Sequence, residues 1–233
     1  MVDVYAESPR APSHFEYAIT IDKRDFPSRV KQNAYHMMNQ LDGWCSYEKA
    51  AILIDTILKV KPEIIVEIGV YGGKSLVPMS YALEVNHKGH IYGVDPWDAT
   101  ESLKGINNAS SEYFWGITNH NAVLEALEQK ILQFNLDRRI TLIRSSSEAA
   151  APIENIDILH IDGNHSPESS YLDVTKWAPL VKSGGLILLD DITWFEQNEY
   201  TQAKSIEWLN THCTKIRARL DLLRSPTEKT EKQ

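Results

Sequence analysis

Short apolar segments alternate with helical patterns along this chain, and the alternation constrains its fold more than any other feature. Segments of strand type, rich in Ile, Leu and Val, are residues 63–68, 90–95, 139–143, 156–161 and 185–190. Helical periodicity is found over residues 47–60, about 73–85, 113–134, about 168–179 and about 197–210. Strands this apolar are buried on both faces, which is typical of a parallel sheet with helices on each side. The sequence therefore predicts an α/β fold with a doubly wound, mostly parallel, Rossmann-like sheet.

The 233 residues are expected to form one domain with a segment added at each end. Residues 1–45 show no clear period and carry scattered aromatic side chains. They are expected to form an irregular or helical cap, either one that shapes a substrate pocket or a simple packing arm or dimer contact. Residues 46–223 hold the α/β domain, and the polar residues 224–233 are expected to form a mobile tail.

Composition excludes several classes of protein. The formal net charge of −8 argues against a nucleic-acid binder, because such proteins need clustered Lys and Arg. No segment approaches the roughly 18 apolar residues of a membrane span. Cys45 and Cys213 form no C-x-x-C pair, so neither a disulfide framework nor a zinc knuckle is encoded. The amino terminus has acidic residues and prolines where a signal peptide would be basic and then apolar, and a cytoplasmic protein is expected.

The turn after the first predicted parallel strand, VEIGVYGGKS, is the first candidate ligand site, since ligands bind at the carboxyl ends of such strands. Gly69 and Gly72 allow a close approach of the backbone to a ligand. A P-loop would need a glycine where Ile68 stands, and the dinucleotide pattern G-x-G-x-x-G does not match. Glu67 would repel a pyrophosphate and suits a cofactor with a cationic amino-acid end, such as S-adenosylmethionine. The alternative is a turn that only packs a helix on a strand.

Four more residues are candidate cofactor contacts. Asp95 ends the second of these strands, where a carboxylate can accept hydrogen bonds from both ribose hydroxyls, or can simply be solvated. Ser75 follows the glycine turn, and Ser146 follows the third strand, where it can border an adenine or cap a helix. Trp97, like Trp194, can stack on adenine or on a sugar, or can be plain packing.

Three carboxylates are expected at the same edge of the sheet. Asp162 follows the strand over 156–161, and Asp190 and Asp191 end the strand over 185–190. Unpaired carboxylates this close would repel one another, and a bound cation relieves that repulsion. Oxygen ligands favour Mg²⁺. Alternatively, one or both aspartates of the pair cap the next helix.

His165 is a candidate catalytic base together with Asp162, three residues before it. An imidazole can remove a proton from a substrate hydroxyl while the metal ion stabilises the alkoxide. The alternative is a structural histidine bonded to a loop carbonyl. His160 is expected to point the other way, into the core, so H-x-D-x-x-H is not interpreted as a metal triad.

Taken together, VEIGVYGGKSL, IYGVDPW and HIDGNHSPESSYLDVTKWAPLVKSGGLILLDDITW resemble the class I S-adenosylmethionine-dependent methyltransferases. The similar branch contains macrolide-sugar O-methyltransferases and cephalosporin-hydroxylase-like proteins, and the resemblance covers about residues 47–210. It implies that Glu67, Gly69 and Asp95 contact S-adenosylmethionine. It also implies, from the family's metal-dependent members, a magnesium ion held by the three aspartates above.

The expected activity is metal-assisted O-methylation of a hydroxyl on a sugar or small secondary metabolite, by a homo-oligomer that binds neither nucleic acid nor membrane. An NAD-dependent oxidoreductase on the same fold and a non-catalytic S-adenosylmethionine-binding subunit are the alternatives. The family's sheet normally ends with two more strands, the last one antiparallel. Only residues 214–223 could form one of them, so another segment, a partner subunit or a shortened sheet must account for the other.

Overall fold

The computed structural model describes residues 3–7, 29–105, 108–196 and 199–216. The strands are β1 (Asp3–Glu7), β2 (Ile64–Ile68), β3 (His90–Asp95), β4 (Ile140–Arg144), β5 (Ile156–Ile161), β6 (Val181–Leu189), β7 (Phe195–Glu196), β8 (Glu199–Tyr200) and β9 (Cys213–Ile216). The helices are α1 (Arg29–Met38), α2 (Tyr47–Val60), α3 (Leu76–Val85), α4 (Ala99–Ser102), α5 (Ala109–Ile117), α6 (His120–Gln133), α7 (Pro167–Trp177), the 3-10 turn η1 (Ala178–Leu180) and α8 (Ala203–His212). No helix in these ranges is long and apolar enough to span a lipid bilayer.

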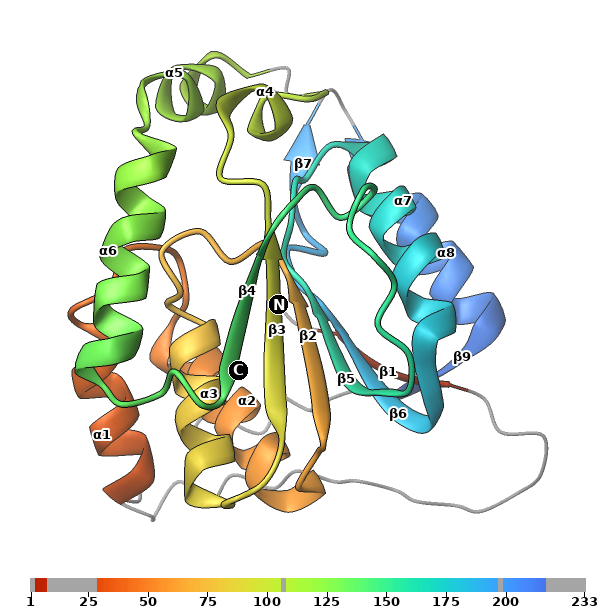
Figure 1. Cartoon of the computed structure of the whole chain (residues 1–233). Helices are drawn as coiled ribbons and strands as arrows, with labels where there is room; N and C mark the ends of the chain where they lie inside the picture. Colours follow the sequence, from red (N-terminus) through yellow and green to blue (C-terminus); the bar gives the residue numbers. More distant parts are fainter. Residues whose placement is uncertain (1–2, 8–28, 106–107, 197–198, 217–233) are drawn as a thin grey trace, which may run out of the picture.

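The predicted parallel sheet is confirmed (Figure 1). Its strand order is β4-β3-β2-β5-β6-β1-β9, and the first five strands run parallel. In the register, Ile68 of β2 lies opposite both Val94 and Ile161, and Ile161 lies opposite Leu189. The strands therefore end level with one another, and the residues that follow them meet at one edge.

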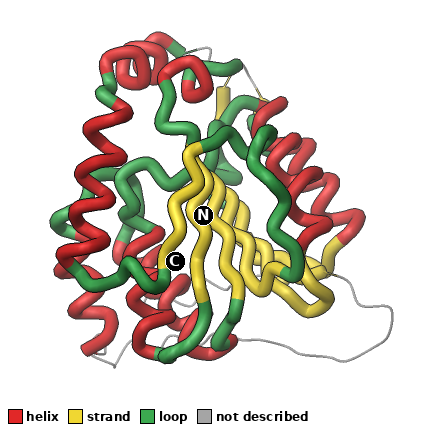
Figure 2. The backbone as a smooth tube through the Cα atoms, in the orientation of Figure 1, coloured by secondary structure: helices red, strands yellow, loops and turns green. Residues whose placement is uncertain are grey.

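Both faces of the sheet are buried, as the apolar strands predict. Ile65 and Ile158 pack in one core cluster with residues of α1, α2, α3 and α6. Val66 and Leu159, the next residues of the same strands, pack in a second cluster with residues of α7 and α8. This alternation follows from the twofold period of a strand. Figures 1 and 2 show the two helical layers on opposite sides of the sheet, with α4 and α5 above its carboxyl edge.

The antiparallel strand with no evident source in the sequence is β1, at the amino terminus. It lies between β6 and β9 and is antiparallel to both, with Asp3 opposite Leu189 and Val4 opposite Ile216. Another segment of the chain therefore completes the sheet, and no partner subunit is needed to supply a strand. Residues 1–45 were expected to form a cap or arm; of this region, α1 is helical and β1 belongs to the sheet.

Two further details differ from the sequence-based prediction. The helical stretch expected over 113–134 is divided into α5 and α6, because the Asn119 side chain accepts a hydrogen bond from the amide of Ala122 (3.1 Å) and so begins a new helix. The strand expected at 185–190 begins earlier, at Val181. The predicted tail, 224–233, lies outside the described residues.

Candidate functional site

A cavity of about 650 Å³ opens at the carboxyl edge of the sheet, a volume that is ordinary for a small-molecule site. Its wall includes the loops that follow β2 to β6, together with residues of α4 and α5. Most of the residues predicted from the sequence line it: Gly69, Ser75, Asp95, Ser146, Asp162, His165, Asp190, Asp191 and Trp194. Three do not: Glu67, Gly72 and Trp97.

Asp95, at the end of β3, accepts hydrogen bonds from the glycine turn that follows β2. Its Oδ2 accepts hydrogen bonds from the amides of Val70 (3.0 Å) and Tyr71 (2.9 Å), and its Oδ1 accepts one from the amide of Trp97 (2.7 Å). Burial raises the pKa of Asp95, and these three hydrogen bonds oppose that shift. The carboxylate predicted to bind a ribose therefore has a structural task as well, and only its remaining lone pairs can face a ligand.

The glycines of the turn allow other backbone segments to approach. Gly69 has φ +84°, and a Cβ there would lie 2.1 Å from the carbonyl oxygen of Asp162. A Cβ at Gly72 would lie 2.5 Å from the carbonyl oxygen of Asp42. Gly72 thus makes room for the loop before α2, and the direct ligand contact predicted for it is not supported by its position.

Trp97 and Ser146 differ in how well their predicted roles match their positions. Trp97 is 1% exposed and packs in the core, and its Nε1 donates to the carbonyl of Tyr71 (2.9 Å). It has no ring face open to the cavity, so the stacking role predicted for it is not available. Ser146 lies on the cavity wall, and its Oγ accepts a hydrogen bond from the amide of Ala149 (3.2 Å).

Glu67 lies beneath the cavity and is fully buried. Its Oε1 accepts a hydrogen bond from Ser75 Oγ (2.6 Å) and lies at hydrogen-bond distance from His160 Nδ1 (2.9 Å). Burial raises the pKa of Glu67 to about 8 and lowers the pKa of His160 to about 3. These shifts favour the neutral form of both groups, so that Glu67 presents less negative charge than the sequence analysis expected beside a cationic cofactor.

The predicted acidic residues do come together, but each already has a partner from the chain. Lys49 of α2 forms ion pairs with Asp162 (Nζ to Oδ2, 2.7 Å) and with Asp190. His165 Nε2 lies 3.1 Å from Asp191 Oδ2. Burial alone would lower the pKa of His165, but the hydrogen bond and charge of Asp191 outweigh it, so that this pKa is raised.

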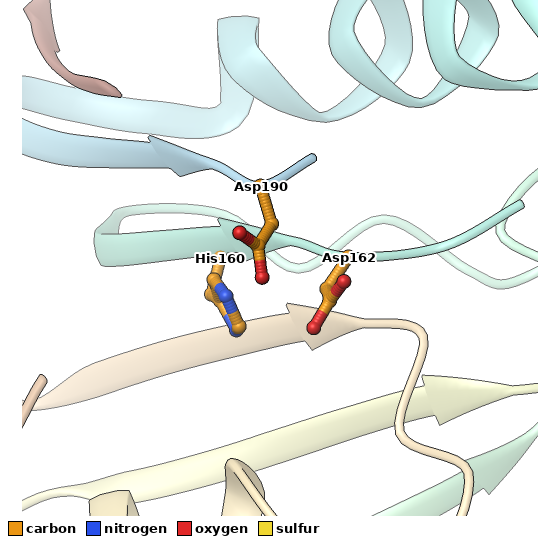
Figure 3. Close-up of side chains that lie close together, drawn as sticks. All are labelled: His160, Asp162 and Asp190. Atoms are coloured by element: carbon orange, nitrogen blue, oxygen red, sulfur yellow. The ribbon is translucent and has the colours of Figure 1, made fainter. Parts of the chain in front are cut away.

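His160 is buried, as predicted, but the expectation that it points away from this cluster is wrong. Figure 3 shows His160 and Asp162 on the same side of β5, with Asp190 facing them from the end of β6. One ligand atom from each of these three residues lies within 4.8 Å of the others. Residues two apart along a strand project from the same face. The alternation along β5 therefore places the His160 imidazole on the same side as Asp162.

A family model described as a methyltransferase domain matches residues 66–192, more than half of the chain. The chain belongs to this methyltransferase family. The resemblance inferred from the sequence motifs is thereby confirmed, and membership favours a methyltransferase over the NAD-dependent oxidoreductase.

Solved methyltransferase structures resemble this methyltransferase at low sequence identity. An O-methyltransferase from Bacillus cereus, in complex with S-adenosylhomocysteine (SAH), has a TM-score of 0.52 at 13% identity, over 84% of this chain and 80% of that one. TomG of Streptomyces achromogenes, an O-methyltransferase of tomaymycin synthesis in complex with S-adenosylmethionine, has a TM-score of 0.51 at 12% identity, over 79% and 77%. An SAH-bound methyltransferase from Podospora anserina has a TM-score of 0.50 at 14% identity, over 79% and 76%. Such likenesses show the fold alone. No curated protein matches the sequence.

The predicted magnesium site can be tested against the donor atoms of this methyltransferase. Three carboxylates are the oxygen ligands that Mg²⁺ prefers. However, the ammonium of Lys49 stands at ion-pair distance from the oxygens of Asp162 and Asp190 that the ion would need. With Lys49 in this position a divalent ion does not fit between Asp162 and Asp190, and the predicted magnesium ion is not confirmed.

Sequence analysis missed functional candidates that come from distant segments. Lys49 falls four residues before the buried Leu53, on the apolar face of α2, and a lysine on that face was the available signal. Trp44 lines the cavity with Tyr71 and Phe114, at ring-centroid distances of 5.3 and 5.2 Å from them. Nothing in the spacing of these aromatic residues indicates that two loops and helix α5 bring them together.

Replacement of Glu67 by glutamine should remove a pH dependence of stability. Glu67 has a raised pKa. Between pH 4.5 and a pH of about 8, the folded protein therefore keeps a proton on Glu67 that the unfolded chain releases. Its contribution to stability therefore falls as pH rises through this range. From pH 6.5 to 8, the titration of His160 in the unfolded chain is common to both proteins and cancels in their difference, so the free energy of unfolding of Glu67→Gln relative to wild type should rise by about 2 kcal/mol.

Urea unfolding at several pH values from 6.5 to 8 measures this difference. Glu63→Gln is the control, since Glu63 is an exposed carboxylate that directly precedes the same strand, β2. A difference between Glu67→Gln and wild type that stays flat over this range would show that Glu67 is ionised in the folded protein.

Proposed function

We propose that this methyltransferase transfers the methyl group of S-adenosylmethionine to a hydroxyl of a small molecule. The observation that carries the proposal is that one cavity joins the glycine turn at Gly69 to the pair formed by His165 and Asp191. The first can hold a cofactor and the second can take up a proton. In support, the Bacillus cereus and Streptomyces achromogenes neighbours are O-methyltransferases with SAH and S-adenosylmethionine bound.

The proton transfer follows from the geometry of the His165 ring. When Nε2 donates its hydrogen to Asp191, Nδ1 is left as a lone-pair acceptor for a substrate hydroxyl. As the hydroxyl oxygen bonds to the methyl carbon, the carbon–sulfur bond breaks and its electron pair stays on sulfur. The hydroxyl proton moves to His165, and the Asp191 carboxylate stabilises the imidazolium that forms. The products are a methyl ether and S-adenosylhomocysteine.

The proposed acceptor is a sugar or another small secondary metabolite. Trp194 lines the cavity, and its ring lies 5.0 Å from the ring of His165, centroid to centroid. Trp44 and Tyr71 are further aromatic residues of the same wall. Aromatic faces of this kind stack on sugar faces and on planar rings. That the protein acts as a homo-oligomer is likewise a proposal.

Calorimetric titration tests the cofactor. We expect S-adenosylmethionine and SAH to bind and NAD not to bind. Release of SAH in the presence of a panel of sugar and phenolic hydroxyls then measures transfer. Failure of both S-adenosylmethionine and SAH to bind would refute the proposal, and tight binding with no transfer across the panel would favour the non-catalytic subunit.

Replacement of His165 by glutamine tests the base. General base catalysis contributes about 10²- to 10⁴-fold, so the kcat of the His165→Gln variant should fall by that factor while its affinity for SAH stays within about twofold. His36→Gln, at an exposed position of α1, is the matched control and should keep wild-type kcat. If His165→Gln retains wild-type turnover, His165 is not the base.

A further inference from the structure

The predicted metal ligands of this methyltransferase are already satisfied by the chain itself. Lys49 forms ion pairs with Asp162 and Asp190, and His165 pairs with Asp191. Repulsion among unpaired carboxylates was the reason to expect a bound cation. In the structure the ammonium group of Lys49 provides the positive charge that relieves the repulsion.

The ion pairs of Lys49 lie deep in the molecule. The side chains of Lys49, Asp162 and Asp190 are 10%, 17% and 11% exposed. Charges that are shielded from water in this way interact strongly and are weakly screened by salt. Removing one member of such a buried set leaves the others as uncompensated charges, which is strongly unfavourable.

The position of Lys49 in its own helix is explained by these partners. Ser46 caps α2 by accepting a hydrogen bond from the amide of Lys49, which places Lys49 in the first turn. A positive charge in the first turn is unfavourable, because the amino-terminal end of a helix is itself the positive end of its dipole. The two carboxylates opposite outweigh that penalty.

We infer that Lys49 occupies the position of a divalent cation between Asp162 and Asp190, and that this site takes no metal ion. An Mg²⁺ ion bound to these carboxylates would sit about 2.1 Å from their oxygens. It would lie next to the ammonium that contacts the same oxygens, and two such cations repel strongly away from water. Lys49 is therefore a positioning residue: it holds the carboxylates beside His165 without touching the acceptor. The inference rests on the proposed function only for its effect on transfer.

Metal binding tests the inference without any substrate. Mn²⁺, titrated into the protein and followed by the loss of the free-ion paramagnetic resonance signal, should show no stoichiometric site in the wild type. In Lys49→Met, the freed oxygens of Asp162 and Asp190, with His160 beside them, should bind one Mn²⁺ ion per chain. Lys49→Arg keeps the positive charge and should bind none.

A matched control comes from α1. Lys31 forms a similar ion pair with Asp55 of α2 (2.6 Å), with 15% and 25% of the two side chains exposed, away from the acidic cluster. Lys31→Met loses this pair and should gain no Mn²⁺ site. A gain confined to Lys49→Met therefore reports the cation position and not a general loosening of the fold.

Three results would overturn the inference: one tightly bound Mn²⁺ in the wild type, no Mn²⁺ in a folded Lys49→Met variant, or wild-type transfer that excess EDTA abolishes and Mg²⁺ restores. If Lys49→Met does not fold, the Mn²⁺ titrations of the wild type and of Lys49→Arg still test the inference. Titration of the same samples with SAH keeps the two proposals apart. Failure of the wild type to bind either SAH or S-adenosylmethionine refutes the proposed function, whereas the Mn²⁺ results concern Lys49 alone.

Discussion

Asp95→Ala is expected to lower the free energy of unfolding by about 4 kcal/mol, because it leaves three backbone amides without an acceptor. These are the amides of Val70, Tyr71 and Trp97, which all donate to the Asp95 carboxylate. Each buried, unpaired donor costs about 1–3 kcal/mol, and water in the cavity can relieve only part of that cost. Since two of the amides belong to the glycine turn, affinity for SAH should fall at least about tenfold as well.

Urea unfolding and SAH titration measure the two effects. Asp98→Ala is the matched control, three residues further along the same loop. Asp98 caps the short helix α4 by accepting hydrogen bonds from the amides of Thr100 (2.8 Å) and Glu101 (3.1 Å) at an exposed position. Loss of such a cap should cost about 1 kcal/mol and leave SAH binding unchanged. Equal losses of stability for the two variants would show that the Asp95 hydrogen bonds do not support the turn.

The parallel core of the fold could be predicted because its signals are local. Each strand from β2 to β6 carries its own run of apolar residues, and the helices between them carry their own period. β1 could not be predicted in this way. Its five residues lie in an aperiodic region, and their strand character depends on pairing with β6, almost the whole chain away, as the match of Asp3 with Leu189 shows.

The site could be predicted only at the strand ends. Parallel strands that end level must bring Asp95, Asp162 and Asp190 to one edge, so their positions follow from the fold. The groups that surround each side chain, by contrast, cannot be derived from the order and ends of the strands. Lys49 reaches the cluster from α2, and burial raises the pKa of Glu67, which its place in the motif does not reveal.

Gly69→Ala is expected to lower the free energy of unfolding by about 3–5 kcal/mol and methyl transfer by about 100-fold. Gly69 has φ +84°, which costs an alanine about 1–2 kcal/mol. In addition, the new methyl group would lie 2.1 Å from the carbonyl oxygen of Asp162 and 2.7 Å from the Cα of Gly163. Backbone cannot rotate away as a flexible side chain can, so β2 and β5 must separate where they end, and Asp162 must move with respect to Lys49.

Gly184→Ala separates the two causes, since Gly184 has nearly the same φ angle, +78°, with no atom within 4 Å of an added Cβ. It should cost only the conformational part, about 1–2 kcal/mol, and leave transfer at the wild-type rate. Urea unfolding and the rate of SAH release compare the two variants. If Gly69→Ala behaves like Gly184→Ala in both measurements, the glycine is required only for its φ angle, and the close contact between the two strand ends does not hold Asp162 in place.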